Sequence, residues 1–193
     1  MNKKRMLLKT IGGAVAYPAF AAPAIKSPSV ENHASYFPNT LLTTHENRKV
    51  KFYDDLIKGK IVVINMMYGM CTEFCPADTA SLMQLQEALG DRVGRDIFMY
   101  SLTLLPELDT PQALNDYVKK YGIKPGWTFL TGKRADVELI RRKLGFYSRR
   151  TEEDADIAQH TGMVRIGNDR FDRWCMAPAQ SSTRQLISTI LSV

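Results

Sequence analysis

One stretch decides the fold, Ile61-Val62-Val63-Ile64-Asn65-Met66-Met67-Tyr68-Gly69-Met70-Cys71-Thr72-Glu73-Phe74-Cys75-Pro76. Its first half is a continuous run of Val, Ile and Met, which favours a strand buried on both faces, as in a parallel sheet. Gly69 can supply the unusual backbone angles that a tight turn needs. Pro76 has a fixed φ and no N–H, so it suits the first position of a helix and places Cys75 at the N-cap. The stretch therefore predicts a strand, a turn carrying Cys71, and a helix.

The two cysteines stand four residues apart across this turn. That spacing can bring their Cα atoms within the roughly 4.4–6.8 Å that a disulfide tolerates. The positive end of the helix dipole favours thiolate, whereas the carboxylates of Glu73 and Asp78 act against it. Cys71 and Cys75 could cycle between dithiol and disulfide or chelate a soft metal. A permanent disulfide or two packed thiols are the structural alternatives.

Strand and helix patterns alternate along the rest of the chain, which predicts an α/β domain with a parallel sheet. Thr110 and Pro111 favour the start of a helix, and Ser181 or Ser182 could cap the last one. The basic run Arg141-Arg142-Lys143 is expected to be a solvated helix end. Expected strands are 41–44 and 48–52 (an entry hairpin), 61–67, 96–104, 127–131, 161–166 and 171–175; expected helices are 76–89, 110–121, 136–144 and 180–193, with a polar loop or short helix at 147–159.

The N-terminus is typical of an export signal. A basic head is followed by a short apolar run and small residues near Ala21. The expected organisation is a signal peptide or membrane anchor (1–24), a linker (25–36) and one domain (37–193), with membrane association possible through residues 6–24. The first 24 residues hold four basic and no acidic side chains, so the formal charge of +6 falls to +2 without them. This balance does not favour nucleic-acid binding. Export implies an oxidising compartment, and the expected location is the bacterial periplasm or the periplasmic face of the inner membrane.

Three further signals accompany the cysteine turn. Cys75 is followed by proline, residues 106–111 read Pro-Glu-Leu-Asp-Thr-Pro, and His160 stands just before a predicted hairpin. On these residues the chain resembles, from about Phe37 to its C-terminus, the Sco/SenC family of thioredoxin-like copper proteins. The resemblance implies a thioredoxin-like fold with an N-terminal β-hairpin and a metal site made of Cys71, Cys75 and His160.

Two thiolates and one imidazole form a soft, low-coordinate set that suits Cu(I), and holds Cu(II) with an added ligand. Zinc also accepts two cysteines and a histidine with an open position. The resemblance implies a copper chaperone that loads the binuclear copper site of cytochrome oxidase, or reduces the cysteines of that site. Its expected partners are this oxidase subunit or another copper acceptor, and a thiol–disulfide reductant that keeps Cys71 and Cys75 reduced.

The sequence also departs from the family pattern. Leu105 and Leu108 replace an acid and an arginine, Thr72 stands where proline often follows the first cysteine, and Gln159 stands where Asp often precedes the histidine. These changes bear more on the delivery partner than on the fold. Other sulfur-containing residues are expected to serve mainly in packing, although thioethers also bind Cu(I); they are Met66, Met67, Met70, Cys175 and Met176.

Two other functions use the same cysteines. An exported thiol–disulfide oxidoreductase or thiol peroxidase would use Cys71 and Cys75 without metal, and His160 would then be incidental. A redox or copper sensor would pass the state of the pair to a partner. Turnover by the metal-free dithiol separates the enzyme from the chaperone.

Overall fold

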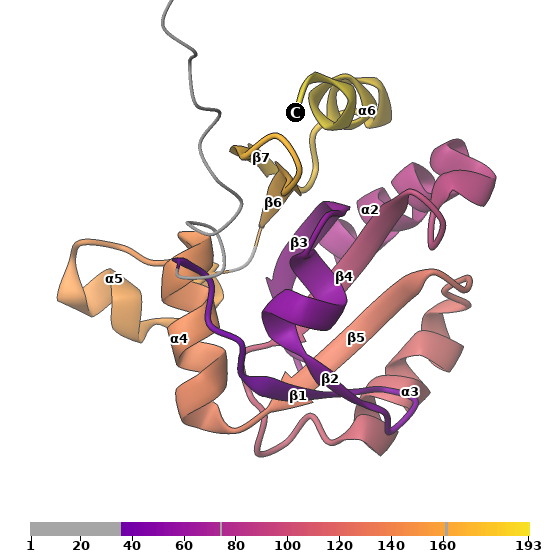
Figure 1. Ribbon diagram of the computed structural model, residues 1–193. Coiled ribbons are helices and arrows are strands. Elements are labelled where there is room, and N and C mark those ends of the chain that lie inside the picture. The colour runs from indigo at the N-terminus through magenta and orange to yellow at the C-terminus, as the bar shows by residue number, and fades with distance from the viewer. Residues whose placement is uncertain (1–35, 74, 161) are drawn as a thin grey trace, which may run out of the picture.

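The computed structural model describes residues 36–73, 75–160 and 162–193, and the strands of this part of the chain form one mixed sheet (Figure 1). The strands are β1 (Leu41–Thr44), β2 (Lys49–Lys51), β3 (Ile61–Met67), β4 (Ile97–Thr103), β5 (Trp127–Gly132), β6 (Met163–Asn168) and β7 (Arg173–Pro178). Their order across the sheet is β2-β1-β5-β4-β3-β6-β7. The central strands β5, β4 and β3 are parallel, and β1 and β6 pair antiparallel with the outer two of them.

Helices cover both faces of the sheet and give a three-layer architecture (Figure 1). They are the π-helix η1 (Phe52–Ile57), α2 (Cys75–Leu89), η2 (Gly90–Arg92), α3 (Pro111–Tyr121), α4 (Arg134–Leu144), α5 (Thr151–Ala155), η3 (Ile157–His160) and α6 (Thr183–Ser192). Side chains of α2, α3 and α6 pack on one face, and those of η1 and α4 pack on the other. Because side chains alternate along a strand, β3 contributes Val63 and Met67 to the first core and Val62, Ile64 and Met66 to the second.

The predicted α/β class, the parallel centre and the entry hairpin are confirmed by this topology. Two predicted helix starts are confirmed as well. The Thr110 hydroxyl accepts from the Ala113 N–H at 3.2 Å with Pro111 as the first residue of α3. Ser182 forms a reciprocal capping box with Gln185 at the start of α6.

Several bounds differ from the prediction. Cys75 is the first residue of α2 instead of its N-cap, and α4 begins at Arg134, two residues early. Phe52, expected at the end of the second hairpin strand, and residues 54–57, expected to lead into β3, belong to η1. The buried residues Phe52, Tyr53, Leu56 and Ile57 have a helical spacing.

The expected signal peptide (1–24) and all but the last residue of the expected linker (25–36) lie outside the described residues. None of the helices in the described part of the chain has both the length and the apolar character needed to cross a bilayer.

Candidate metal centre

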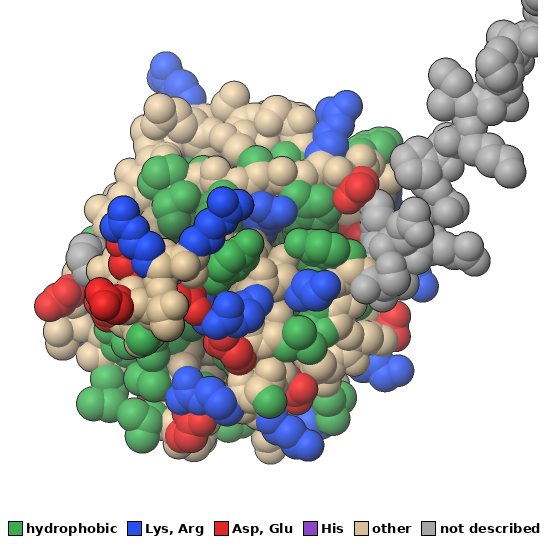
Figure 2. Space-filling view, turned by 90° about the vertical axis from the view of Figure 1, so that its left-hand side faces the viewer, with side chains coloured by type: hydrophobic (Ala, Val, Ile, Leu, Met, Phe, Trp, Pro, Cys, Tyr) green, Lys and Arg blue, Asp and Glu red, His purple; other side chains and the backbone are tan. Residues whose placement is uncertain are grey.

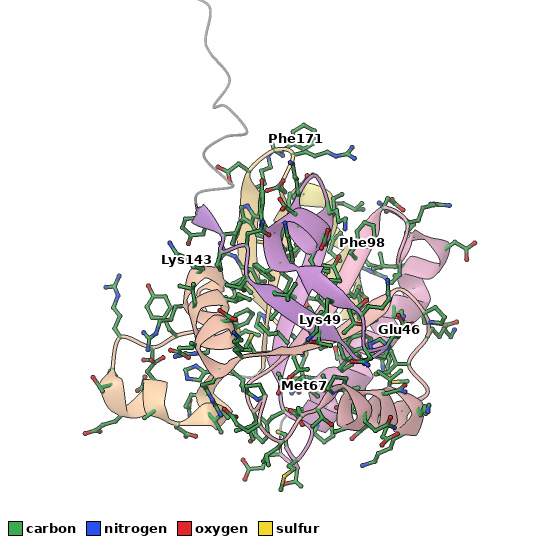
Figure 3. All side chains as sticks on the ribbon, turned by 60° about the horizontal axis from the view of Figure 1, so that its bottom comes forward. Glu46, Lys49, Met67, Phe98, Lys143 and Phe171 are labelled. Carbon is green, nitrogen blue, oxygen red and sulfur yellow. The ribbon has the colours of Figure 1, made fainter. Side chains whose placement is uncertain are left out.

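The cysteine turn begins where β3 ends, at the carboxyl edge of the parallel strands, the edge at which open α/β sheets usually bind ligands. Met67 marks this end of β3 in Figure 3. The Gly69 N–H lies 3.1 Å from both carboxylate oxygens of Asp109, which also accepts from the Thr103 hydroxyl. A Cβ at position 69 would lie 2.8 Å from Asp109 Oδ1, and Gly69 does not adopt a positive φ. Glycine is therefore needed here for close approach to Asp109, and not for the unusual backbone angles that the sequence suggested.

Both sulfurs accept backbone N–H groups of the turn. The Cys75 N–H points at Cys71 Sγ at 3.3 Å, and the Tyr68 N–H bonds to the Cys75 sulfur. The Tyr68 phenol contacts the Cys71 sulfur, and the two thiols also contact each other. Both cysteines are free thiols and are buried in the core between β3 and α2. The turn therefore places two adjacent sulfurs against an apolar wall.

Cys75 is held in its protonated form. Burial, the contact with Cys71 and the charge of Asp78 raise the pKa of the Cys75 thiol from 9.0 to about 12, although the Tyr68 N–H acts in the opposite direction. Burial and the contact with Cys71 raise the pKa of the Tyr68 phenol to about 12 as well. The helix N-terminus does not overcome the loss of hydration at Cys75, since a buried sulfur loses the water that stabilises its charge.

Helix α2 is tied to the chain that follows His160. The buried Asp78 carboxylate accepts from the Gly162 N–H at 2.9 Å and from Gln180 Nε2 at 3.0 Å. The Ser81 hydroxyl donates to the Ala179 carbonyl at 2.7 Å. Gly162 lies two residues after His160, and Asp78 lies three residues after Cys75. The segment that carries His160 therefore ends on the cysteine helix.

His160 itself is buried in a polar site formed by α4 and α5. Its ring nitrogens lie 3.2 and 3.1 Å from Arg141 Nη1, and Nε2 lies 2.8 Å from the Asp154 carbonyl oxygen. Arg141 also pairs with the carboxylates of Glu138 and Asp154, and donates to the Phe146 carbonyl at 2.6 Å. Acidic and basic side chains are interleaved on the face of the molecule that carries α4 and α5 (Figure 2).

The expectation that Arg141 belongs to a solvated helix end is therefore wrong, because its side chain is only 5% exposed. Its neighbour Arg142 is half exposed, as expected. Asp154 is also mostly covered, and Arg141 holds the pKa of its carboxyl well below the usual range. The short helix predicted as one alternative within residues 147–159 is confirmed as α5, which has no buried residues, and Asp154 ties it to α4 through this network.

Cys71 and Cys75 are thus brought together, and His160 is not. Within residues 36–73, 75–160 and 162–193, no three His, Cys, Asp or Glu side chains are grouped closely enough to hold a metal ion. The described arrangement is a two-thiol site with His160 held separately on Arg141 and Asp154.

The sulfur-containing side chains near the cysteine pair differ in burial. Met66 and Met67 are buried on opposite faces of β3, which confirms that they pack in the core. Met70, beside Cys71, is 70% exposed, so the expectation that it packs in the core is wrong. Cys175 lies on β7, half buried against the same core as the paired cysteines, and burial raises its pKa.

The comparison with protein families covers most of the chain. Residues 32–193 match the family model described as SCO1/SenC. This chain belongs to the SCO1/SenC family. Among curated Sco proteins, a SCO2-like protein of Rickettsia conorii is 28% identical over 105 residues, which cover 54% of this chain and 50% of that protein. The mitochondrial SCO1 homolog of Homo sapiens is 29% identical over 133 residues, covering 66% of this chain and 43% of the human protein. The chain therefore spans about half or less of the length of these curated relatives.

Solved Sco structures share the fold. A SCO1/SenC family lipoprotein from Bacillus anthracis superposes with a TM-score of 0.64 at 17% identity, covering 81% of this chain and 93% of that one. Yeast Sco1 with copper bound gives 0.62 at 16% identity, covering 79% and 87%. ScoI of Bradyrhizobium japonicum with copper bound gives 0.60 at 19%, covering 79% and 95%. These likenesses confirm the predicted thioredoxin-like Sco fold.

Sequence reasoning missed three residues that shape the site. Asp109 fixes Gly69, Asp78 joins α2 to Gly162, and Tyr68 contacts both cysteines. A signal for Asp109 was present, because it is one of the two acids, with Glu107, kept in the stretch 106–111 where neighbouring polar positions are replaced by leucine. Asp78 was considered only as a charge near the cysteines, and its two hydrogen bonds reach residues 84 and 102 positions away.

Proposed function

We propose that this protein is a Sco-type copper carrier that binds Cu(I) through Cys71, Cys75 and His160 and delivers it to the binuclear copper site of cytochrome oxidase, or reduces the cysteines of that site. The observation that carries the proposal is the pair of adjacent buried thiols at the carboxyl edge of the sheet in a chain of this family. Two thiols in a water-poor pocket fit a soft monovalent ion better than a hard one, since thiolate is the ligand that Cu(I) prefers.

His160 joins this site by changing partners. It leaves Arg141 and the Asp154 carbonyl, and its ring turns toward the sulfurs while Gly162 stays fixed on Asp78. The hydrogen bond between Gly162 and Asp78 supports this step, because it keeps the chain two residues from His160 next to the helix that begins at Cys75. Delivery then proceeds by ligand exchange, in which each incoming thiolate or imidazole of the acceptor replaces one leaving donor.

The redox state of the pair controls loading. Loss of two electrons and two protons from Cys71 and Cys75 forms a disulfide and removes both thiolate ligands. A thiol–disulfide reductant of the exported compartment supplies those electrons and restores the binding form. The same two-electron step, run against a disulfide in the acceptor, reduces the acceptor's cysteines and leaves Cys71–Cys75 oxidised.

The raised pKa of Cys75 argues against a thiol peroxidase in which Cys75 is the attacking residue. A peroxidatic cysteine attacks as thiolate and needs a lowered pKa, whereas the pKa of Cys75 is about 12. A metal ion does not share this requirement, because it displaces the proton on binding. The redox or copper sensor remains the third function, and it would show itself as a partner that binds one redox state only.

Copper titration against a competing Cu(I) chelator tests the proposal. The reduced chain should bind one copper tightly, and its disulfide form should not. Cys75→Ser should lose tight binding, His160→Ala should weaken it, and Cys175→Ser should match the parent. Tight one-to-one copper in both Cys75→Ser and His160→Ala would overturn the site assignment. Peroxide or insulin reduction that persists unchanged in His160→Ala, with no copper bound by either redox form, would establish the oxidoreductase instead.

A further inference from the structure

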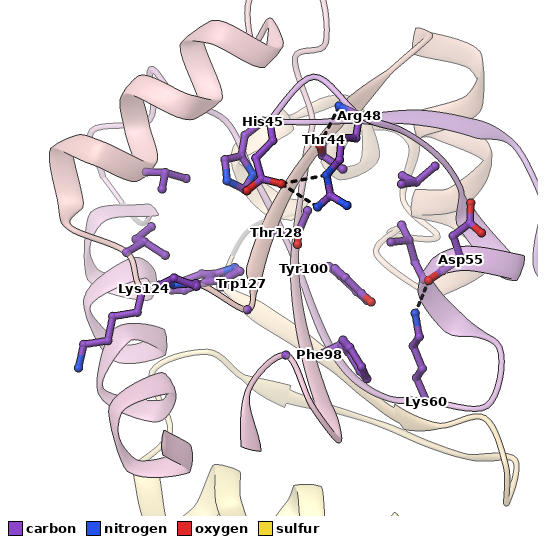
Figure 4. Close-up of a pocket in the computed structure, with 18 of the residues that line it drawn as sticks. Thr44, His45, Arg48, Asp55, Lys60, Phe98, Tyr100, Lys124, Trp127 and Thr128 are labelled. Carbon is purple, nitrogen blue, oxygen red and sulfur yellow. Dashed lines mark hydrogen bonds and ion pairs between the residues drawn. The ribbon is translucent and has the colours of Figure 1, made fainter. Parts of the chain in front are cut away.

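A hollow lies at the edge of the sheet opposite the cysteines. Helix α4 and η1 leave the amino ends of β4 and β5 uncovered on their face, and this opening has a volume of about 800 Å³. Its floor includes Phe98 and Tyr100 of β4 and Thr128 of β5, which Figure 4 shows in the close-up of the hollow. The hairpin β1–β2 and the residues before β3 form its walls. This size is typical of a small-molecule site.

Tyr100 is the unusual member of the floor. Its side chain is 4% exposed, and its hydroxyl makes no hydrogen bond with any of the described residues. Figure 4 shows the hydroxyl turned toward the side of the hollow from which Asp55 and Lys60 come. The ring is packed into the floor, while the hydroxyl oxygen is not fully enclosed and opens onto the hollow. A ligand in the hollow can therefore bond to this hydroxyl in place of water.

Two lysines at the hollow lack a carboxylate partner within the described part of the chain. Lys60 donates to the backbone carbonyl of Asp55, and its ammonium lies 4.7 Å from the centre of the Phe98 ring. Lys49 donates to the Thr43 hydroxyl at 2.8 Å. The other cations of the lining are neutralised, since Arg48 pairs with Glu46 and Lys124 pairs with Glu87. The hollow thus offers two ammonium groups that form no ion pair with the described residues, beside an aromatic floor, although the charge of Asp55, which also lines the hollow, acts on Lys60.

We propose that this hollow binds a small aromatic carboxylate. The ring lies on Phe98 and Thr128, and the carboxylate accepts from the Tyr100 hydroxyl and the Lys60 ammonium, with Lys49 adding positive charge at the rim. An aromatic body fits the floor because rings stack on rings in offset or edge contacts. A carboxylate fits the donors because it accepts from a hydroxyl and an ammonium at once.

The site is separate from the metal centre. Phe98 and Tyr100 pair with Val62 and Ile64 near the start of β3, whereas the cysteine turn follows Met67 at its end. Binding at the hollow therefore does not need either cysteine, and the proposal stands whether or not the copper proposal fails.

Nuclear magnetic resonance of the reduced, metal-free chain tests the site with sodium benzoate, and with benzamide as the uncharged probe of the same shape. Benzoate should give saturable shifts of the Phe98, Tyr100 and Thr128 amide signals at millimolar concentration, and benzamide should not. Tyr100→Phe and Lys60→Met should each weaken benzoate by about tenfold or more. Lys143→Met is the matched control, because Lys143 lies on α4 over the Tyr36 ring, outside the lining of the hollow (Figure 3).

Each outcome decides the matter. Tyr100→Phe removes only a hydroxyl, and dispersed amide signals verify that every variant is folded. Absence of saturable shifts with the parent, equal shifts from benzamide, or parental affinity in both Tyr100→Phe and Lys60→Met would overturn the proposal. Loss of benzoate binding in Lys143→Met alone would show that the anion binds elsewhere, and would overturn it as well.

Discussion

The Cys75 thiol should stay protonated across the whole neutral range and should therefore react slowly. Its side chain is 2% exposed, and burial, Cys71 and Asp78 raise its pKa to about 12. At pH 7 the thiolate fraction is then about 10⁻⁵, against about 10⁻² for a thiol at the ordinary value of 9.0. Because only the thiolate is alkylated, protonation alone slows the reaction of Cys75 about a thousandfold.

The assay is pulsed alkylation with iodoacetamide between about pH 7 and about pH 10. A Cys175→Ser background removes the third thiol, a phosphine keeps the pair reduced, and peptide mass spectrometry reads Cys71 and Cys75 separately at low modification. The rate at Cys75 should rise about tenfold for each pH unit and should not level off near pH 9. Circular dichroism over the same range verifies that the fold persists.

The slope with pH is the informative quantity, because burial slows alkylation of any thiol by restricting access. A covered thiol with an ordinary pKa would be slow too, but its rate would stop rising near pH 9. A plateau at Cys75 at or below that pH would refute the reasoning. It would mean that the helix N-terminus and the Tyr68 N–H stabilise the thiolate more than burial and Cys71 destabilise it.

The affinity for copper should depend on the same thiol proton of Cys75. Cys75 binds copper as thiolate and is protonated below a pKa of about 12, so each copper bound releases that proton. The apparent affinity should therefore rise with pH, by up to about tenfold per unit for each proton released. Chelator competition at two pH values measures the slope, and calorimetry in two buffers of different ionisation enthalpy counts the protons. An affinity that is flat with pH would contradict the protonated resting state.

Two substitutions test the supports of the site. Asp109→Ala should lower the free energy of unfolding by about 1–3 kcal/mol and speed alkylation in the turn, because the Gly69 N–H and the Thr103 hydroxyl lose their acceptor. Urea denaturation measures the loss of stability, and an unchanged midpoint would be evidence against that loss. Asp154→Asn should destabilise the fold by about 1–3 kcal/mol at pH 7, since Arg141 keeps only its other carboxylate partner. Arg141 lowers the pKa of Asp154, so the stabilisation by this ion pair is present above the unfolded-state pKa of about 3.9 and shrinks as the pH falls below that value. The urea midpoints of parent and variant should therefore converge in acid.

The part of the fold that the sequence predicted is the part that local patterns specify. The continuous apolar run of β3 favours a strand buried on both sides, and Thr110 and Ser182 carry the capping chemistry that starts a helix. The sequence prediction ends the hairpin strand at Phe52 and treats residues 54–57 as a connection, because a helical segment of six residues is too short for its period to stand out. In the structure Phe52 and Leu56 are buried together.

At the candidate site, too, the sequence predicted what local patterns specify and missed what distant contacts decide. The cysteine pair is local, so spacing and the following proline placed it correctly at the end of β3. The role of Gly69 depends on Asp109, forty positions away, and no pattern around Gly69 distinguishes a close approach from a positive φ. Arg141 shows the same limit, because a basic helix end looks solvated until α5 brings Asp154 back across it.

We expect copper binding to need a rearrangement at the histidine but not at the cysteine pair. Cys71 and Cys75 already lie together, whereas His160 must give up its contacts with Arg141 and the Asp154 carbonyl before it can ligate. Each hydrogen bond released costs about 1 kcal/mol, so part of the metal–imidazole energy is spent on the rearrangement. Thus His160→Ala should weaken copper less than Cys75→Ser does, although both remove one ligand. A larger loss in His160→Ala, measured by the same chelator competition, would mean that the histidine is already in place and that the described contacts of Arg141 are not those of the binding form.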